Sequence, residues 1–264
     1  MAREIRVLVL RAAGSNCDWE TAHAFQLAGA QAELVHVNRL AEDSKRLDRY
    51  HILAIPGGFT YGDDVSAGKI LANELKYKLG EQVQRFVDEG KLVLGICNGF
   101  QVLVKAGLLP YGRIRDGRQL VTLTFNDSGR FEDRWVYLKP DPSSPCVFTR
   151  GMEHTITLPV AHAEGKFVPA DSGVLELLEA NHQIVFRYVG PNGGPAPYPW
   201  NPNGSIGDVA GICDPTGRIF GLMPHPERHV DPTHHPRWTR EGLRTEGDGL
   251  AIFRHAVQYA REEL

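Results

Sequence analysis

The chain has 264 residues, of which 42% are hydrophobic and 23% charged, with a formal net charge of -3. This balance gives no reason to expect nucleic acid or an anionic membrane as a partner. No apolar run approaches the ~20 residues that span a bilayer. The first residues lead directly into a strand-like run, so we expect neither a membrane segment nor a signal peptide. The four cysteines form no C-x-x-C pair, which favours free thiols and a cytoplasmic protein.

The N-terminal part of the chain alternates between predicted strands and predicted helices. Short apolar runs predict strands at 5–10, 32–37, 52–55 and 91–96, and the helical patterns lie at 19–27 and 69–89. This order, with short connections, predicts a parallel sheet with right-handed crossovers. In such sheets the ligand site lies beyond the carboxyl ends of the strands.

The second half of the chain changes to strand-like stretches separated by turn-rich segments. We expect strands at 120–125, 134–139, 155–160, 181–189, 209–213 and 218–223. Helical periodicity returns only at about 249–262. The absence of a low-complexity linker favours a single domain over residues 1–264, an α/β fold in which added strands complete one core.

The motif Gly-Ile-Cys-Asn-Gly at residues 95–99 joins a buried strand to a helical pattern that ends near Gly107. This is the spacing of a nucleophile elbow, with Cys97 in place of the usual serine. The sharp turn requires small neighbours, and the free N–H groups of the following helix favour the thiolate form. The alternative is a buried structural cysteine, but the strand–turn–helix context favours a nucleophile.

A cysteine nucleophile needs a base, and His225 is the best placed of the eleven histidines. It follows a predicted strand, so it should lie at the same edge of the sheet as Cys97. Glu227, two residues further on, is positioned to orient the imidazole as the third member of a triad. The alternative is a proline-rich surface loop with an incidental histidine.

Two backbone N–H groups are candidates for an oxyanion hole. Gly58 ends the strand before the elbow in the run Pro-Gly-Gly-Phe, and Asn98 follows the nucleophile. A simple tight turn is the alternative for Gly58.

The histidines at 225, 229, 234 and 235 suggest a metal site, but no cysteine lies near them in sequence and the proline-rich spacing lacks a helical pair. We therefore expect no metal. The run Ala-His-Ala-Glu-Gly at 161–165 is either part of the substrate site or a solvated turn.

Together the three motifs around Cys97, Gly58 and His225 resemble class I, triad-type glutamine amidotransferases. Further runs at 14–18, 56–64, 161–165 and 201–205 are most similar to glutaminase subunits of phosphoribosylformylglycinamidine synthase. The resemblance covers nearly the whole chain. Ser66 stands where many members have a basic residue, and Ala163 stands where glycine is expected.

The resemblance implies a flavodoxin-like, mostly parallel open sheet with helices on both faces and added antiparallel strands. It also implies that Cys97 is the nucleophile, His225 the general acid and base, and Glu227 its orienter. Gly58 and Asn98 would form the oxyanion hole, and Gln101 would help to hold the substrate, glutamine.

The same resemblance implies partners. Ammonia would pass to a synthetase subunit that binds ATP and Mg²⁺, with a small accessory subunit in the complex. No Walker-type phosphate loop occurs in this chain, which agrees with ATP binding elsewhere.

Three alternatives remain at this stage. One is a glutaminase subunit of another class I amidotransferase. Another is a cysteine hydrolase of the DJ-1/PfpI type, although many of those have histidine where this chain has Asn98. The third is a non-catalytic interaction subunit with the same fold, which the intact Cys97, His225 and Glu227 disfavour.

Overall fold

The structure, a computed structural model, describes residues 3–114 and 119–264. Its strands are β1 (Arg6–Arg11), β2 (Gln31–His36), β3 (Ile52–Ile55), β4 (Leu92–Ile96), β5 (Val121–Thr124), β6 (Glu132–Pro140), β7 (Ile156–His162), β8 (Lys166–Pro169), β9 (Ile184–Val189), β10 (Val209–Cys213) and β11 (Ile219–Leu222). Its α-helices are α1 (Asp18–Leu27), α2 (Val37–Glu42), α3 (Lys69–Lys78), α4 (Gly80–Asp88), α5 (Asn98–Ala106), α6 (Ser172–Ala180), α7 (Trp238–Glu241) and α8 (Leu250–Glu263).

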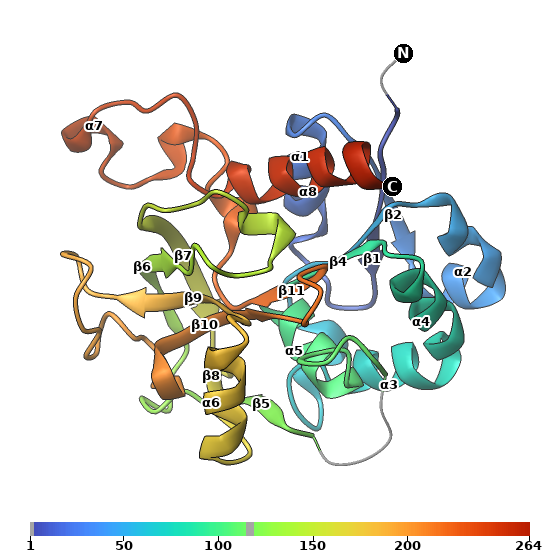
Figure 1. Ribbon diagram of the computed structural model, residues 1–264, viewed down its shortest axis with the longest axis horizontal. Coiled ribbons are helices and arrows are strands. Elements are labelled where there is room, and N and C mark those ends of the chain that lie inside the picture. Colours follow the sequence, from blue (N-terminus) through green and yellow to red (C-terminus); the bar gives the residue numbers. More distant parts are fainter. Residues whose placement is uncertain (1–2, 115–118) are drawn as a thin grey trace.

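Strands from both halves of the chain form one nine-stranded sheet in the order β2-β1-β3-β4-β11-β10-β9-β6-β7, and β5 and β8 pair separately (Figure 1). The first five strands of this order are parallel, whereas β10, β9, β6 and β7 extend the sheet by antiparallel pairing. The predicted α/β fold, with a mostly parallel first part and added antiparallel strands, is therefore confirmed.

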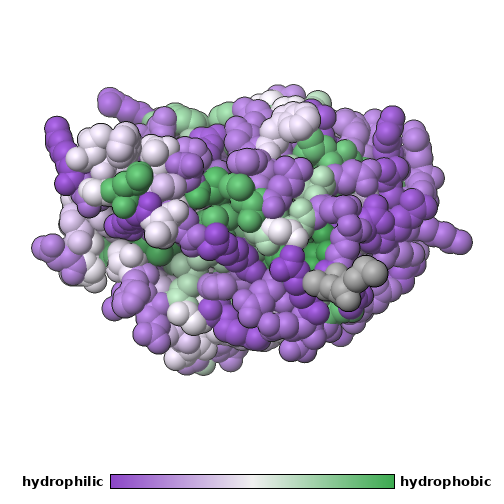
Figure 2. All heavy atoms as spheres, turned by 90° about the horizontal axis from the view of Figure 1, so that it is seen from above, coloured by the Kyte–Doolittle hydropathy of each residue, from purple (hydrophilic) through white to green (hydrophobic). Residues whose placement is uncertain are grey.

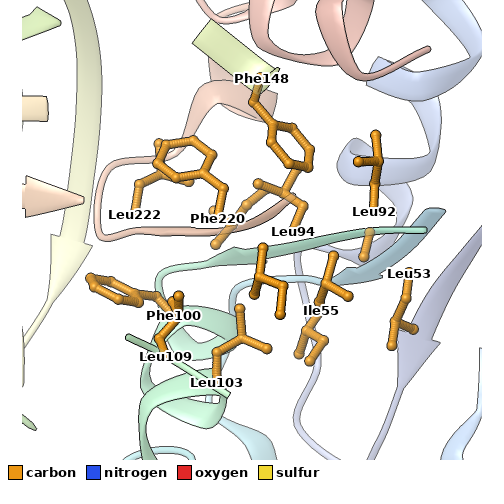
Figure 3. Close-up of a cluster of buried hydrophobic side chains, with 14 of the residues drawn as sticks. Leu53, Ile55, Leu92, Leu94, Phe100, Leu103, Leu109, Phe148, Phe220 and Leu222 are labelled. Atoms are coloured by element: carbon orange, nitrogen blue, oxygen red, sulfur yellow. The ribbon is translucent and has the colours of Figure 1, made fainter. Parts of the chain in front are cut away.

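The central strands are buried on both faces. Every residue of β3, β4 and β11 is buried, as expected for parallel strands covered by helices. In Figure 1, α1 and α8 lie on one side of this part of the sheet, and α3 and α5 lie on the other. Figure 3 shows the resulting core, with Phe100 and Leu103 of α5 below β4 and Phe148 above it. This packing fixes the start of α5 against the sheet.

The prediction of one continuous helix over 69–89 was wrong. Two helices, α3 and α4, meet at Leu79, whose φ of -124° and ψ of 6° are not helical. Leu79 is nevertheless buried, so the apolar periodicity continues across the break. The periodicity alone therefore cannot show that the helix ends there.

The prediction that no helix occurs between residues 107 and 249 was also wrong. The nine-residue helix α6 lies there, and the Asp171 side chain caps it by accepting a hydrogen bond from the Val174 N–H at 3.0 Å. Its apolar face is short, which explains why periodicity alone missed it.

The surface seen in Figure 2 is mostly hydrophilic, with several apolar areas between the polar side chains. Exposed large apolar residues include Val65, Trp19 and Phe125. Within the described ranges, no helix is both long enough and apolar enough to cross a membrane.

The close approach of α5 to β3 requires glycine at position 99. A Cβ atom there would lie 1.9 Å from the carbonyl oxygen of Ile55, which is backbone and cannot rotate away. We expect Gly99→Ala to lower the free energy of unfolding by about 2–3 kcal/mol and the Tm by at least ~5 °C. Thermal and guanidinium unfolding of the full chain would measure this.

Gly194→Ala is the matched control, since a Cβ atom at Gly194 meets nothing within 4 Å. Its effect should stay within about 0.5 kcal/mol. Equal losses in the two variants would contradict the steric explanation.

Candidate active site

Cys97 lies in the turn between β4 and α5, at the carboxyl end of the central strand. Its backbone is left-handed, with φ 51° and ψ -105°, which is unfavourable for any residue except glycine. Its N–H donates a hydrogen bond to the Leu222 carbonyl at 2.8 Å. A Cβ atom on Gly95 would lie 2.7 Å from the carbonyl carbon of Gly99, so the turn closes only with small residues on both sides. This is the strained strand-to-helix turn that the sequence predicts.

The Cys97 sulfur faces the end of β7. Its Sγ lies 3.7 Å from the carbonyl oxygen of Ala161, and the residue is only 4% exposed. The first N–H groups of α5 have no partner within their own helix, so they form a partial positive charge beside the sulfur.

His225 reaches the same place from the neighbouring strand. β11 pairs with β4 in parallel, with Leu222 opposite Ile96, so the residues that follow the two strands share one edge of the sheet. The His225 N–H donates to the Pro159 carbonyl at 2.8 Å, which fixes the loop. The structure therefore brings the predicted nucleophile and the predicted base together.

Glu227 holds the His225 imidazole through a 2.5 Å contact between Oε1 and Nδ1, and both side chains are buried. Burial lowers the pKa of His225, but the Glu227 carboxylate and the sulfurs of Cys97 and Cys17 outweigh it and hold the pKa well above its usual value. Nε2 has no hydrogen-bond partner among the described residues. Glu227 therefore orients the imidazole and favours its protonated form.

Gly58 lies beside the loop that follows β1. Gly58 and Ser15 form a short antiparallel β-bridge. The hydrogen bonds beside it are donated by the N–H groups of Cys17 and Phe59. At φ 145°, a Cβ atom on Gly58 would lie 2.6 Å from the Gly14 carbonyl oxygen, so only glycine fits. Within the described residues, the Gly58 N–H has no backbone partner, which leaves it available as a donor.

The Asn98 side chain joins this segment to the elbow. Its Oδ1 accepts from the Thr60 hydroxyl at 2.6 Å, and its Nδ2 donates to Gln101 Oε1 at 3.0 Å and to Asp63 Oδ1 at 3.2 Å. Gln101 in turn donates to the Glu164 carbonyl at 2.7 Å. The predicted substrate residue Gln101 is thus at the site, with its amide already bonded to protein groups at both ends.

The 161–165 run is part of the site rather than a remote turn. Besides the carbonyls of Ala161 and Glu164, the Glu164 carboxylate accepts from the Ala67 N–H at 3.2 Å and lies 3.8 Å from Lys105 Nζ. Burial, followed by the charge of Glu164, raises the pKa of Asp63 to about 6. Asp63, Glu164 and Lys105 therefore form a cluster of ionisable groups beside the Asn98 and Gln101 side chains.

Comparison with known proteins identifies the family. The family model described as "CobB/CobQ-like glutamine amidotransferase domain" matches residues 4–260. The chain belongs to this amidotransferase family. It is 52% identical over 259 residues to the phosphoribosylformylglycinamidine synthase subunit PurQ of Dehalococcoides mccartyi, covering 98% of this chain and 99% of that protein. It is 45% identical over 266 residues to the protein of the same name from Methanococcus maripaludis, covering 96% and 97%.

A chain of the solved structure of PurLQS from Thermotoga maritima superposes with a TM-score of 0.73 at 31% identity, covering 97% of this chain and 99% of that one. Amidotransferase membership thus agrees with the fold and with the nucleophile elbow.

Two residues at this amidotransferase site were missed by the sequence analysis. Cys17 lies in the loop after β1, and its Sγ accepts a hydrogen bond from Arg228 Nη2 at 3.0 Å. A Cβ atom on Gly57 would lie 2.7 Å from His225 Cε1 and 3.3 Å from Cys17 Sγ, so this thiol stands beside the imidazole. The position of Cys17 after a parallel strand was the available signal.

Of the histidines considered for a metal, His229 and His235 lie side by side, with ring centroids 5.7 Å apart. His229 and His235 each pack edge-on against Trp135, with ring centroids 4.9 Å apart. Within the described residues, neither belongs to a group of metal-ligating side chains. Besides this packing, His229 Nδ1 donates to the Thr157 carbonyl at 2.7 Å, and His235 Nδ1 lies 3.7 Å from Glu241 Oε2.

Glu227→Gln should remove the attraction that keeps His225 protonated. Because the pKa of His225 is raised above its unfolded value of ~6.5, its contribution to stability is complete below that pH and is lost as pH rises through the folded pKa. In that window, we expect wild-type stability to fall by up to about 1.4 kcal/mol per pH unit more than that of the variant. Urea unfolding from pH 6 upward would measure the difference.

His182→Gln is the control, since it removes an exposed contact of 2.8 Å with Asp141. The free energy of unfolding of this variant should depend on pH as that of the wild type does, because exposed ion pairs contribute little to stability. If stability depended on pH equally in the wild type and in Glu227→Gln, the buried pair would be ruled out as the cause of that dependence.

Proposed function

We propose that the chain is the glutaminase subunit of phosphoribosylformylglycinamidine synthase, and that Cys97, His225 and Glu227 form its catalytic triad. The observation that carries the proposal is the buried His225–Glu227 pair beside a cysteine in a strained elbow. Nearly full-length identity to proteins named PurQ supports the choice of synthase.

The reaction begins when the Cys97 thiolate attacks the side-chain carbonyl carbon of glutamine. A C–S bond forms, and the negative charge moves to the carbonyl oxygen, where the N–H groups of Gly58 and Asn98 can donate to it. His225 then gives its proton to the nitrogen, the C–N bond breaks and ammonia leaves. A water molecule, deprotonated by the same imidazole, then attacks the thioester carbon; the C–S bond breaks, glutamate leaves and the Cys97 thiolate is restored.

Glu227 keeps its position throughout. It fixes the imidazole ring and stabilises the cationic form that must carry the proton to the leaving nitrogen. Gln101 lies one turn after Cys97 in α5, bonded to Asn98 and to the Glu164 carbonyl, and from there it helps to hold glutamine.

The ammonia passes to a synthetase subunit, which binds ATP and Mg²⁺; a small accessory subunit completes the complex. The solved relative named PurLQS supports a multi-subunit assembly. We place the protein in the cytoplasm, in keeping with four free cysteines.

Cys97→Ala tests the nucleophile. In the complex with the synthetase, glutamine-dependent product formation should fall by about 10⁴-fold or more. With ammonium as the nitrogen donor, the same complex should keep its rate within about twofold, because the variant leaves assembly intact. Product formation with each donor is the measurement.

Cys213→Ala provides a control thiol that is buried in β10, away from the elbow. It should keep glutamine-dependent activity. Glutamine turnover retained in Cys97→Ala would contradict the triad. If the chain supported product formation only with a different synthetase, the result would instead indicate a subunit of another class I amidotransferase.

A further inference from the structure

Asp63 lies at the end of the turn that follows Gly58, and the reaction described above gives it no part. Its Oδ1 accepts a hydrogen bond from Asn98 Nδ2 at 3.2 Å, and at the other end of the same amide Asn98 Oδ1 accepts from the Thr60 hydroxyl at 2.6 Å. Thr60 and Asn98 are buried, and Asp63 is half-buried. The 60–63 turn therefore contacts both ends of one amide.

We propose that Asp63 is a positioning residue for the oxyanion hole. As a carboxylate it holds the Asn98 amide, and through that amide it keeps the N–H groups of Gly58 and Asn98 aligned toward one carbonyl oxygen. This inference rests on the proposed function, because it concerns the donors that stabilise the negative charge formed when Cys97 attacks glutamine. Asp63 acts through Asn98 and does not itself contact the substrate.

The two donors belong to different parts of the fold, so their relative position needs a link between those parts. The Gly57–Gly58 peptide is fixed by the loop after β1, because the Cys17 N–H donates to the Gly57 carbonyl at 3.2 Å. The Asn98 N–H belongs instead to the first turn of α5, directly after Cys97. The Asn98 side chain joins the two parts by bonding to the turn that follows Gly58.

The backbone around Asp63 is strained. Tyr61, Asp63 and Val65 have φ angles of 56°, 57° and 70°, in the left-handed region that residues other than glycine rarely adopt. Such a conformation persists only where surrounding contacts impose it. Val65 is 89% exposed, whereas the Tyr61 N–H donates to the Ala13 carbonyl at 2.7 Å and Asp63 bonds to Asn98. The contacts of Tyr61 and Asp63 therefore anchor a strained segment whose far end is open to solvent.

The charge on the Asp63 carboxyl depends on its burial and on groups from neighbouring elements. Burial raises the pKa of Asp63, and the Glu164 carboxylate raises it further, to about 6. The Lys105 ammonium, the Gly68 N–H and the Asn98 amide lower this pKa but do not outweigh the other two causes. The carboxyl therefore titrates within the pH range in which enzymes are ordinarily assayed.

The charged groups of α3, which packs against the 60–63 turn, act on other partners. Glu74 accepts a hydrogen bond from the Tyr61 hydroxyl and pairs with Lys78 at 2.7 Å. Burial lowers the pKa of Lys105, and the nearby Lys69 of α3 lowers it further. These groups hold the turn and the lysine beside it, and they leave the bond to Asn98 to Asp63 and Thr60.

Protonation of Asp63 weakens the link. A carboxylate accepts a hydrogen bond that is roughly twice as strong as one between neutral groups. Below about pH 6, the Asn98 amide therefore loses part of the attraction that joins it to the turn. The alignment of the two donors matters when the oxyanion forms rather than when glutamine binds, so its loss lowers kcat and leaves KM nearly unchanged.

Glutamate release by the complex, measured from pH 5 to pH 8 with Asp63→Asn, tests the proposal. This isosteric variant resembles the protonated carboxyl. The ratio of wild-type kcat to variant kcat should therefore be close to one at pH 5 and should rise, with a midpoint near pH 6, to at least about tenfold at pH 8. The ratio cancels the titrations of Cys97 and His225, which both enzymes share. The KM for glutamine should change by less than about twofold.

Asp64→Asn is the matched control, because it makes the same change at the exposed neighbouring residue. Its kcat should follow that of the wild type at every pH. A ratio for Asp63→Asn that does not change with pH would overturn the proposal, and so would an effect confined to KM. Glutamine turnover that persists in Cys97→Ala would refute both proposals, whereas a constant ratio in an enzyme that depends on Cys97 would refute only this one.

Nuclear magnetic resonance tests the link in the wild-type chain without relying on activity or on a variant that folds. The side-chain amide ¹⁵N signal of Asn98 and the carboxyl ¹³C signal of Asp63 should shift together, with a shared midpoint near pH 6. An Asn98 amide signal that does not respond while Asp63 titrates would overturn the proposal.

Discussion

The structure depends on a steric constraint at the start of α5. Cys97 must take a left-handed backbone so that its sulfur stands clear of the sheet, and this brings α5 against β3 and β4. Glycine at positions 95 and 99 is the only way to accommodate that approach. The adjacent strand β11 obeys the same constraint, because a Cβ atom on Gly221 would lie 2.2 Å from the Phe100 ring. The packing of the core and the backbone geometry at Cys97 are therefore one requirement.

The buried pair of His225 and Glu227 shows how the fold meets the cost of placing charges in its interior. Removing two charges from water is expensive, and the attraction between them offsets this only at short range. Pro226 limits the loop between them, and the Pro159 carbonyl fixes its start. A carboxylate two residues from the imidazole can therefore hold it at 2.5 Å. The raised pKa of His225 is the consequence of that geometry.

Much of the fold and of the proposed triad could be predicted because both have local signals. The parallel strands appear as short apolar runs, and Cys97, His225 and Glu227 lie in distinct motifs at strand ends. The break at Leu79 had a weak local signal because burial continues across it. The short helix α6 had a weak signal because its apolar face is narrow. The contact between Cys17 and Arg228 joins residues 211 positions apart, so no spacing rule could reveal it.

The Asn98 side chain explains why the predicted oxyanion donors belong to one unit. Gly58 and Asn98 come from different strand ends, yet Asn98 accepts from Thr60 and donates to Asp63, which lie on the segment that follows Gly58. The position of one donor is thus tied to the other through a single amide. Because the pKa of Asp63 is about 6, this link includes a carboxyl group that titrates near neutral pH. The charge on that carboxyl therefore acts on the same amide that links the segments of the two predicted oxyanion donors.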